Sequence, residues 1–158
     1  MKLLRRTEQQ LVFTLSRLEQ EILRDLLGRY PVLRADFQPL SREANPQDPK
    51  HQANQQMLVE ALAAQKAEHC RMRDQFLAKP DRLRQANRHW ELRLETAEVE
   101  WLLQVLNDVR VGCWERAGCP EEHHFDQMEV TEQNARDLFL MEMSGFFQHE
   151  FLEALGAP

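Results

Sequence analysis

The stretch of residues 96–118, TAEVEWLLQVLNDVRVGCWERAG, is the most strongly patterned part of the chain. Its apolar residues recur at helical spacing and form one broad arc on a helical wheel. Thr96 is a suitable N-cap residue, and Gly118 followed by Pro120 is a suitable end for a helix. We therefore predict a central helix over residues 96–117.

Arg110 lies inside the apolar arc of this central helix, whereas Asn107 and Asp108 lie at its two edges. Removing the partner of a buried charge costs about 3–5 kcal/mol. We therefore predict that Arg110 pairs with a carboxylate of another helix. Glu19 is the best-placed candidate, because it falls within the apolar stripe of the first predicted helix. Candidate residues for binding a ligand or partner are Arg110, Asn107, Asp108, Trp101 and Glu19. The alternative is that the Arg110 pair only fixes the register of two helices, and this alternative is favoured.

Apolar residues at helical spacing predict four further helices, at residues 8–27, 53–78, 82–94 and 131–155. Thr7 and Gln10 resemble a capping box at the start of the first one. Residues 31–52 hold four of the seven prolines and form a Pro-rich connection. These segments predict an all-α fold, a single-domain bundle of about five helices over residues 1–158. The helices at 96–118 and 131–155 are expected at its centre.

The overall charge and the cysteines limit the classes of partner and the compartment. The net charge of −6 argues against nucleic acid and anionic membranes as partners. No apolar run approaches the roughly 20 residues that a membrane-spanning helix needs. The three cysteines are an odd number, and no apolar signal segment follows the first residues. We therefore expect a reduced, cytoplasmic protein.

A weak metal-site pattern is formed by Cys113, Cys119, His123 and His124. Two thiolates and two imidazoles could complete a tetrahedral zinc site. Their spacing is not a standard one, however, and Cys113 points into the apolar arc. Free cysteines and surface histidines are therefore the favoured interpretation, and no cofactor is predicted. Since the sequence also lacks a Gly-rich phosphate loop, an HExxH motif and a nucleophile–base arrangement, no catalytic residue is predicted.

The central helix contains the pattern W-x(4)-L-N-D-x-R-x(5)-R, formed by Trp101, Leu106-Asn107-Asp108, Arg110 and Arg116. This segment resembles a bacterial family of uncharacterised all-helical proteins. In actinobacteria the family is often encoded beside the adaptor of the Clp protease, and some members are labelled transcriptional regulators. The chain departs from the family at Trp114, where glycine is usual. The resemblance implies a helical fold and a link to regulated proteolysis or gene expression, but no reaction.

Two functional hypotheses follow from the sequence. The first is a non-enzymatic interaction or regulatory module, an accessory of Clp-type proteolysis or of gene regulation. It has a protein partner and the capacity to form homo-oligomers. Its expected surfaces are the apolar excess of the last helix and the Pro-rich connection. The alternative is a small-ligand-binding or metal-dependent enzyme with a polar site around Arg110, Asn107 and Asp108.

Overall fold

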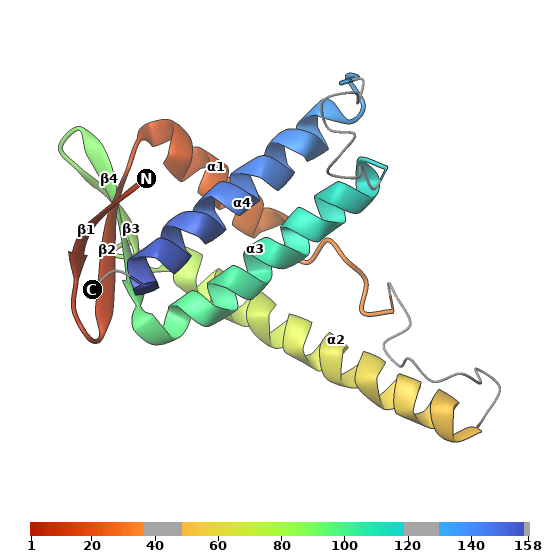
Figure 1. Ribbon diagram of the computed structural model, residues 1–158. Coiled ribbons are helices and arrows are strands. Elements are labelled where there is room, and N and C mark those ends of the chain that lie inside the picture. The colour runs from red at the N-terminus through yellow and green to blue at the C-terminus, as the bar shows by residue number, and fades with distance from the viewer. Residues whose placement is uncertain (37–48, 119–129, 157–158) are drawn as a thin grey trace.

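Four helices and a four-stranded antiparallel sheet form the part of the chain that the computed structural model describes, residues 1–36, 49–118 and 130–156 (Figure 1). In order these are β1 (Lys2–Arg6), β2 (Gln10–Leu15), α1 (Arg17–Arg29), α2 (Pro49–Ala78), β3 (Leu83–Ala86), β4 (His89–Glu95), α3 (Thr96–Arg116) and α4 (Ala135–Gly156). The strand order is β1-β2-β4-β3. The predicted all-α fold is therefore wrong, because the protein combines helices with a sheet.

The strand β2 occupies residues for which a helix is predicted. Leu11, Phe13 and Leu15 all belong to the hydrophobic core, and their two-residue spacing is the period of one strand face, although Val12 is buried as well. Because Leu11 and Leu15 are four residues apart, they also fit helical spacing, and this caused the error. The helix α1 begins only after Ser16, whose side chain forms a capping box with Glu19.

The pair Thr7 and Gln10, which resembles a helix cap in the sequence, forms the turn between β1 and β2 instead. The Thr7 N–H donates to the Gln10 carbonyl at 2.8 Å, and the Gln10 N–H donates to Oγ1 of Thr7 at 3.0 Å. A hydroxyl that satisfies backbone groups serves a turn as well as a helix end. The predicted helix cap is therefore wrong, and the two residues close a turn between strands.

A hairpin of β3 and β4 replaces the short helix predicted at residues 82–94. Its two-residue turn lies between Ala86 and His89 and includes Asn87, with φ of 54°. Tight hairpin turns require this left-handed conformation, which Asn tolerates. Across the strand pair, Nη2 of Arg84 lies 2.8 Å from Oε2 of Glu91. An ion pair thus joins the two strands of the hairpin.

The core lies between the sheet and the helices α1, α3 and α4 (Figure 1). The most extensive contact between elements is that of α3 with α4, and both confirm predicted helices. Phe13 of β2 meets Phe151 of α4 edge to face, with ring centroids 5.3 Å apart. None of the helices in the described segments is long and apolar enough to span a membrane.

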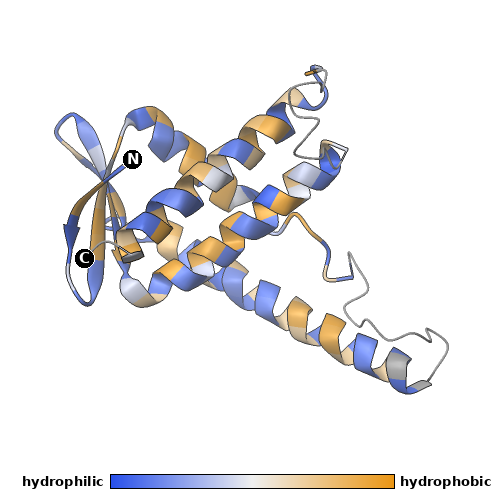
Figure 2. Cartoon of the chain, viewed as in Figure 1, coloured by the Kyte–Doolittle hydropathy of each residue, from blue (hydrophilic) through white to orange (hydrophobic). Residues whose placement is uncertain are grey.

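The helix α2 confirms the helix predicted at residues 53–78 and begins earlier, at Pro49. Its second half packs on the core through Phe76, whose ring centroid lies 5.9 Å from that of Trp101 on α3. Its first half projects away from the sheet and the other helices (Figure 1). Apolar residues occur along both halves (Figure 2). Of the predicted Pro-rich connection, residues 37–48 lie outside the described part.

Candidate functional site

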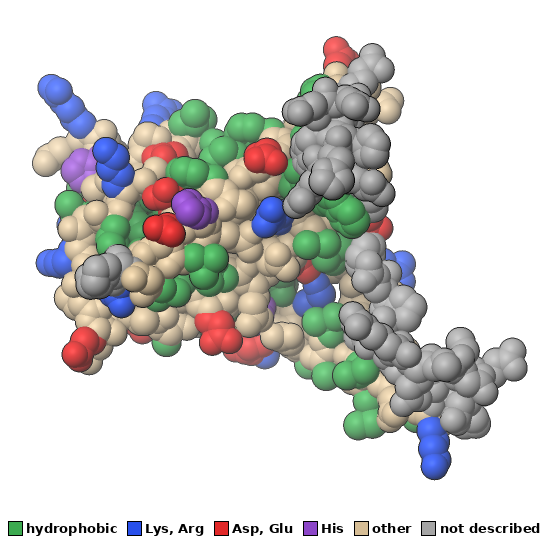
Figure 3. Space-filling model, in the orientation of Figure 1, with side chains coloured by type: hydrophobic (Ala, Val, Ile, Leu, Met, Phe, Trp, Pro, Cys, Tyr) green, Lys and Arg blue, Asp and Glu red, His purple; other side chains and the backbone are tan. Residues whose placement is uncertain are grey.

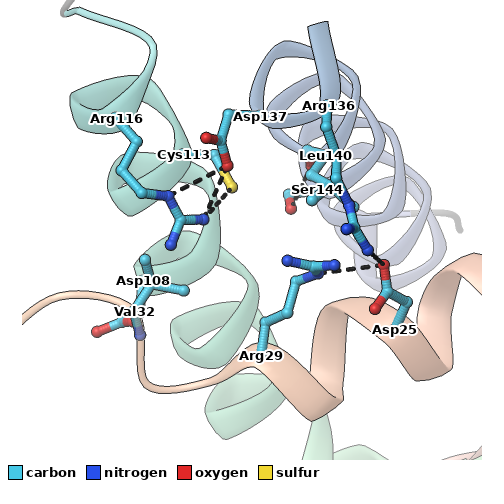
Figure 4. Close-up of polar contacts among 10 residues, drawn as sticks. All are labelled: Asp25, Arg29, Val32, Asp108, Cys113, Arg116, Arg136, Asp137, Leu140 and Ser144. Carbon is cyan, nitrogen blue, oxygen red and sulfur yellow. Dashed lines mark hydrogen bonds and ion pairs between the residues drawn. The ribbon is translucent and has the colours of Figure 1, made fainter. Parts of the chain in front are cut away.

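Asp108 on α3 is buried and joins three parts of the chain. Its Oδ1 accepts hydrogen bonds from the backbone N–H groups of Val32 at 2.7 Å and Leu33 at 3.2 Å. Its Oδ2 pairs with Nζ of Lys66 on α2. Figure 4 shows Asp108 next to Val32, in the segment that follows α1. We call this group the Asp108 clamp, because one carboxylate holds α2 and the segment after α1 against α3.

The close approach of the segment after α1 to α3 depends on Gly112. A Cβ built on Gly112 would overlap the side chain of Val32. The glycine lies one turn after Asp108, so both residues act on the same crossing. At this crossing α3 therefore supplies a hydrogen-bond acceptor, Asp108, and a position without a side chain, Gly112.

A second polar pair lies beside the clamp. The hydroxyl of Tyr30 and Nδ1 of His69 on α2 are 3.4 Å apart, and Nζ of Lys66 is 5.7 Å from the centroid of the Tyr30 ring. Burial lowers the pKa of His69, and burial together with the Asp108 carboxylate raises the pKa of Tyr30. Both side chains are therefore uncharged at neutral pH.

These groups form one wall of a pocket of about 530 Å³ between the segment after α1 and the helices α2, α3 and α4. Its lining comprises Tyr30, Leu33, Arg34, Ala35, Leu62, Gln65, Lys66, His69, Leu103, Gln104, Asn107, Asp108 and Gln148. The volume is within the range of small-molecule sites, roughly 300–1,000 Å³. No Ser, Thr or Cys is among these lining residues, so they supply binding groups and acid–base groups but no aliphatic hydroxyl and no thiol.

The structure separates the polar residues predicted on the central helix. Asn107 and Asp108 both line the pocket, although Asn107 is exposed and Asp108 is buried. Arg110 is exposed and makes no ion pair within the described part of the chain. Its Nε would lie 3.6 Å from a Cβ at Gly145, so it lies along α4. The predicted burial of Arg110 is therefore wrong. Its side chain lies at the edge of the contact between α3 and α4, where it stays exposed.

Glu19 is not the partner of Arg110, which corrects the predicted ion pair. Its carboxylate accepts the Ser16 N–H at 2.7 Å and pairs with the N-terminal ammonium of Met1. Burial raises the pKa of Glu19, but the hydrogen bonds from the N-terminus and Ser16 outweigh it, and the pKa is lowered. Trp101 is a core residue, buried against Phe76. These two predicted site residues thus lie outside the pocket.

Ion pairs join the helix α4 to α3 and to α1 (Figure 4). Nη2 of Arg116 on α3 lies 2.8 Å from Asp137 on α4 and donates to Sγ of Cys113 at 3.4 Å. Cys113 is fully buried, and burial raises the pKa of its thiol. It is thus the core cysteine that the sequence favoured. The other three members of the weak zinc pattern, Cys119, His123 and His124, lie outside the described residues.

Sequence reasoning missed three residues of the pocket wall, Tyr30, Lys66 and His69. Of these, His69 is buried. Helical periodicity offered a signal, because Lys66 and His69 share one face of α2 with Phe76. The polar character of the first two concealed that this face is the packed one.

The projecting half of α2, residues 50–65, is a second and largely exposed surface. Near its end, Nε2 of Gln65 donates to Oε1 of Gln104 on α3 at 2.9 Å. Met57 is 67% exposed and Leu58 is 44% exposed. Hydrophobic side chains gather on this projecting arm in the space-filling view (Figure 3). Exposed apolar groups that cluster on one element are typical of interaction surfaces.

The model of a family described as "Domain of unknown function (DUF2017)" matches residues 1–155. No curated protein and no solved structure matches the chain.

Proposed function

We propose that this chain, which belongs to the DUF2017 family of unknown function, is a non-enzymatic protein-interaction module. The observation that carries this proposal is the projecting half of α2, which holds Met57 and Leu58 in solvent. Fully burying side chains of this kind stabilises a complex by about 1.5–3 kcal/mol each. A partner that covers both therefore gains enough free energy to recognise this surface.

The projecting half is suited to recognition because it stays helical without help from the core. Residues 50–65 include four Ala and four Gln, with two Leu and one Met, and all of these residue types have high helix propensity. The packed second half supplies the first turns, so the projecting half only extends an existing helix. A partner then meets a preformed helix and loses little conformational entropy on binding.

A second candidate function is the binding of a small ligand, and the pocket of about 530 Å³ favours it. The Asp108 clamp gives this pocket one rigid wall, and the exposed Asn107 amide supplies a donor and an acceptor. This candidate keeps the predicted Asn107 and Asp108 but gives no role to Arg110. Met57 is not among the pocket-lining residues, and Asn107 lies on α3, so substitutions at these two positions can separate the two functions.

The resemblance suggests where to look for the protein partner. Components of Clp-type proteolysis and of gene expression are the first classes to compare, in a cytoplasmic lysate. Neither class is favoured by the pocket or by the projecting half of α2, so the experiment must be open to both.

The experiment compares partner capture by the wild-type chain with capture by the double variant Met57→Glu, Leu58→Glu. Leu152→Glu is the matched control, because Leu152 is 55% exposed on α4, away from α2. We expect a specific partner to be depleted at least about tenfold from the double variant, as the loss of about 1.4 kcal/mol or more implies. The control should retain it.

Capture of the same proteins in the same amounts by all three chains contradicts the proposal. For the ligand-binding candidate, Asn107→Leu tests the pocket while leaving Met57 and Leu58 in place. If partner capture falls with Asn107→Leu and not with the double variant, the pocket is the functional surface.

A further inference from the structure

Six exposed residues of α2 follow the spacing of a coiled-coil seam. Successive members are alternately four and three residues apart, which is the heptad spacing of a and d positions. We call this group the α2 seam: Lys50, Asn54, Met57, Ala61, Ala64 and Glu68. On a helical wheel it lies about a quarter turn from His69 and Phe76, which pack inward. The seam residues themselves are exposed in the single chain.

The α2 seam is complementary to itself when one copy is reversed. In an antiparallel pair centred on Val59, Met57 lies opposite Ala61 and Asn54 lies opposite Ala64 of the other copy. Each Met57 side chain then fills the space beside the small Ala61 of the other copy. Because of the two-fold symmetry, this contact occurs twice, once on each side of the centre. At the two outer ends, Lys50 lies opposite Glu68. A parallel pair would instead place Lys50 beside Lys50 and Glu68 beside Glu68, so charge selects the antiparallel arrangement.

The residues beside the seam fit the same two-fold symmetry. Leu58 flanks the seam and meets its own copy near the axis on one side, where 44% of its surface is exposed in the single chain. Glu60 flanks the seam on the other side and faces its own copy. The first contact stabilises the pair, whereas the second opposes it slightly because like charges repel.

We propose that the partner at the projecting half of α2 is a second copy of this chain, which pairs antiparallel through the α2 seam. This inference rests on the proposed function and names its partner. The seam covers about 27 Å of helix at 1.5 Å per residue, which makes a small interface. The dimer is accordingly weak, with a dissociation constant on the order of tens of micromolar.

Sedimentation equilibrium from about 5 to about 500 μM tests the dimer. We expect the wild-type chain to change from monomer to dimer in this range. Met57→Glu should raise the dissociation constant at least about tenfold, because it places a carboxylate against the seam of the other copy. Leu152→Glu is the matched control and should leave it within about twofold. Circular dichroism checks that each variant keeps its helix content.

The substitution Glu60→Gln tests whether the two copies of Glu60 face each other across the two-fold axis. Removing the repulsion between the two copies of Glu60 should tighten the dimer by about twofold. The orientation is tested by oxidising Met57→Cys and Ala61→Cys chains, separately and mixed. The antiparallel pair predicts that the mixed disulfide forms faster than either homodisulfide. Faster homodisulfides overturn the antiparallel arrangement.

A wild-type chain that remains monomeric up to the highest concentration overturns the inference, as does a dimer that Met57→Glu does not weaken. The proposed function has a separate outcome. If the chain is monomeric but partner capture still depends on Met57 and Leu58, the interaction module stands with a different protein as its partner.

Discussion

The helices α3 and α2 are both correctly predicted from their sequences, but they occupy opposite environments. In α3, nine residues from Val99 to Cys113 are buried. In α2, which is longer, only the second half reaches the core, through His69 and Phe76. The comparison shows that a helical pattern does not reveal how much of a helix is packed. The stability of α3 comes from burial, whereas the projecting half of α2 depends on helix propensity.

The Asp108 clamp joins these two helices, so its removal should have the largest effect. Asp108→Ala leaves the Lys66 ammonium and two backbone N–H groups without their partner. We expect the free energy of unfolding to fall by about 3–5 kcal/mol. Urea unfolding measures it, and Asn107→Ala, one residue away but exposed, is the control, with a change within about 0.5 kcal/mol. Equal losses for the two variants would show that the clamp contributes nothing specific.

Truncating one leucine on each helix tests the contrast directly. Leu106 on α3 is 0% exposed and Leu58 on α2 is 44% exposed. Leu106→Ala should cost about 2–5 kcal/mol of unfolding free energy, because it leaves a cavity in the core. Leu58→Ala should stay within about 0.5 kcal/mol when measured in dilute, monomeric protein. A large loss for Leu58→Ala would mean that the projecting half is packed in solution.

Gly112 tests the other component of the crossing over α3. Gly112→Ala should destabilise the protein by about 1–3 kcal/mol, because its Cβ overlaps Val32. Val32→Ala in the same chain should restore part of that loss by removing the overlapping atoms. Gly28→Ala on α1 is the control, since nothing lies within 4 Å of a Cβ there. A double variant no more stable than Gly112→Ala alone would place the strain elsewhere.

The smallest expected effect is a pH dependence from His69. Its pKa is lowered in the folded state from 6.5, so below that pH the unfolded chain binds more protons. Stability should therefore fall as the pH decreases from about 6.5 toward the folded-state pKa. Unfolding free energies of the wild-type chain and of His69→Gln, measured at pH 7.5 and about 5.5, give the difference. A wild-type pH slope that persists unchanged in His69→Gln would contradict it. Glu19, whose pKa is also lowered, contributes only at lower pH, below its ordinary value of 4.5.

The wrong elements share one physical cause. Residues 10–15 and 83–94 contain apolar residues whose spacing fits both a helix and a strand. In each case pairing with another strand settled the outcome. Phe13 lies opposite Leu92, and Leu11 lies opposite Leu94, although some 80 residues separate them in the chain. A pattern within one segment cannot contain a partner so distant. Only the Asn87 turn offered a local signal for the hairpin.

The candidate site was predictable only in part for a related reason. The sequence identified Asn107 and Asp108 as polar residues at the edges of an apolar arc. Which of the neighbouring polar residues is buried, however, depends on what packs against each edge. Asp108 is covered by α2 and by the segment that follows α1, whereas the edge of α3 near Arg110 stays open. The pocket needs residues from four segments, so no single pattern could indicate it.

The sequence by itself determined the helices α2, α3 and α4, because their apolar residues recur over many turns. It also determined that Cys113 belongs to the core. The predicted N-cap Thr96 is instead the first residue of α3, and Glu95 is the cap.

The tertiary structure decided that residues 2–15 and 83–95 form a sheet, because strand hydrogen bonds join residues distant in the chain. It decided as well that Asp108, and not Arg110, is the buried charge of α3. A charge enters the interior only where partners from other segments meet it, and only the folded chain brings those partners together.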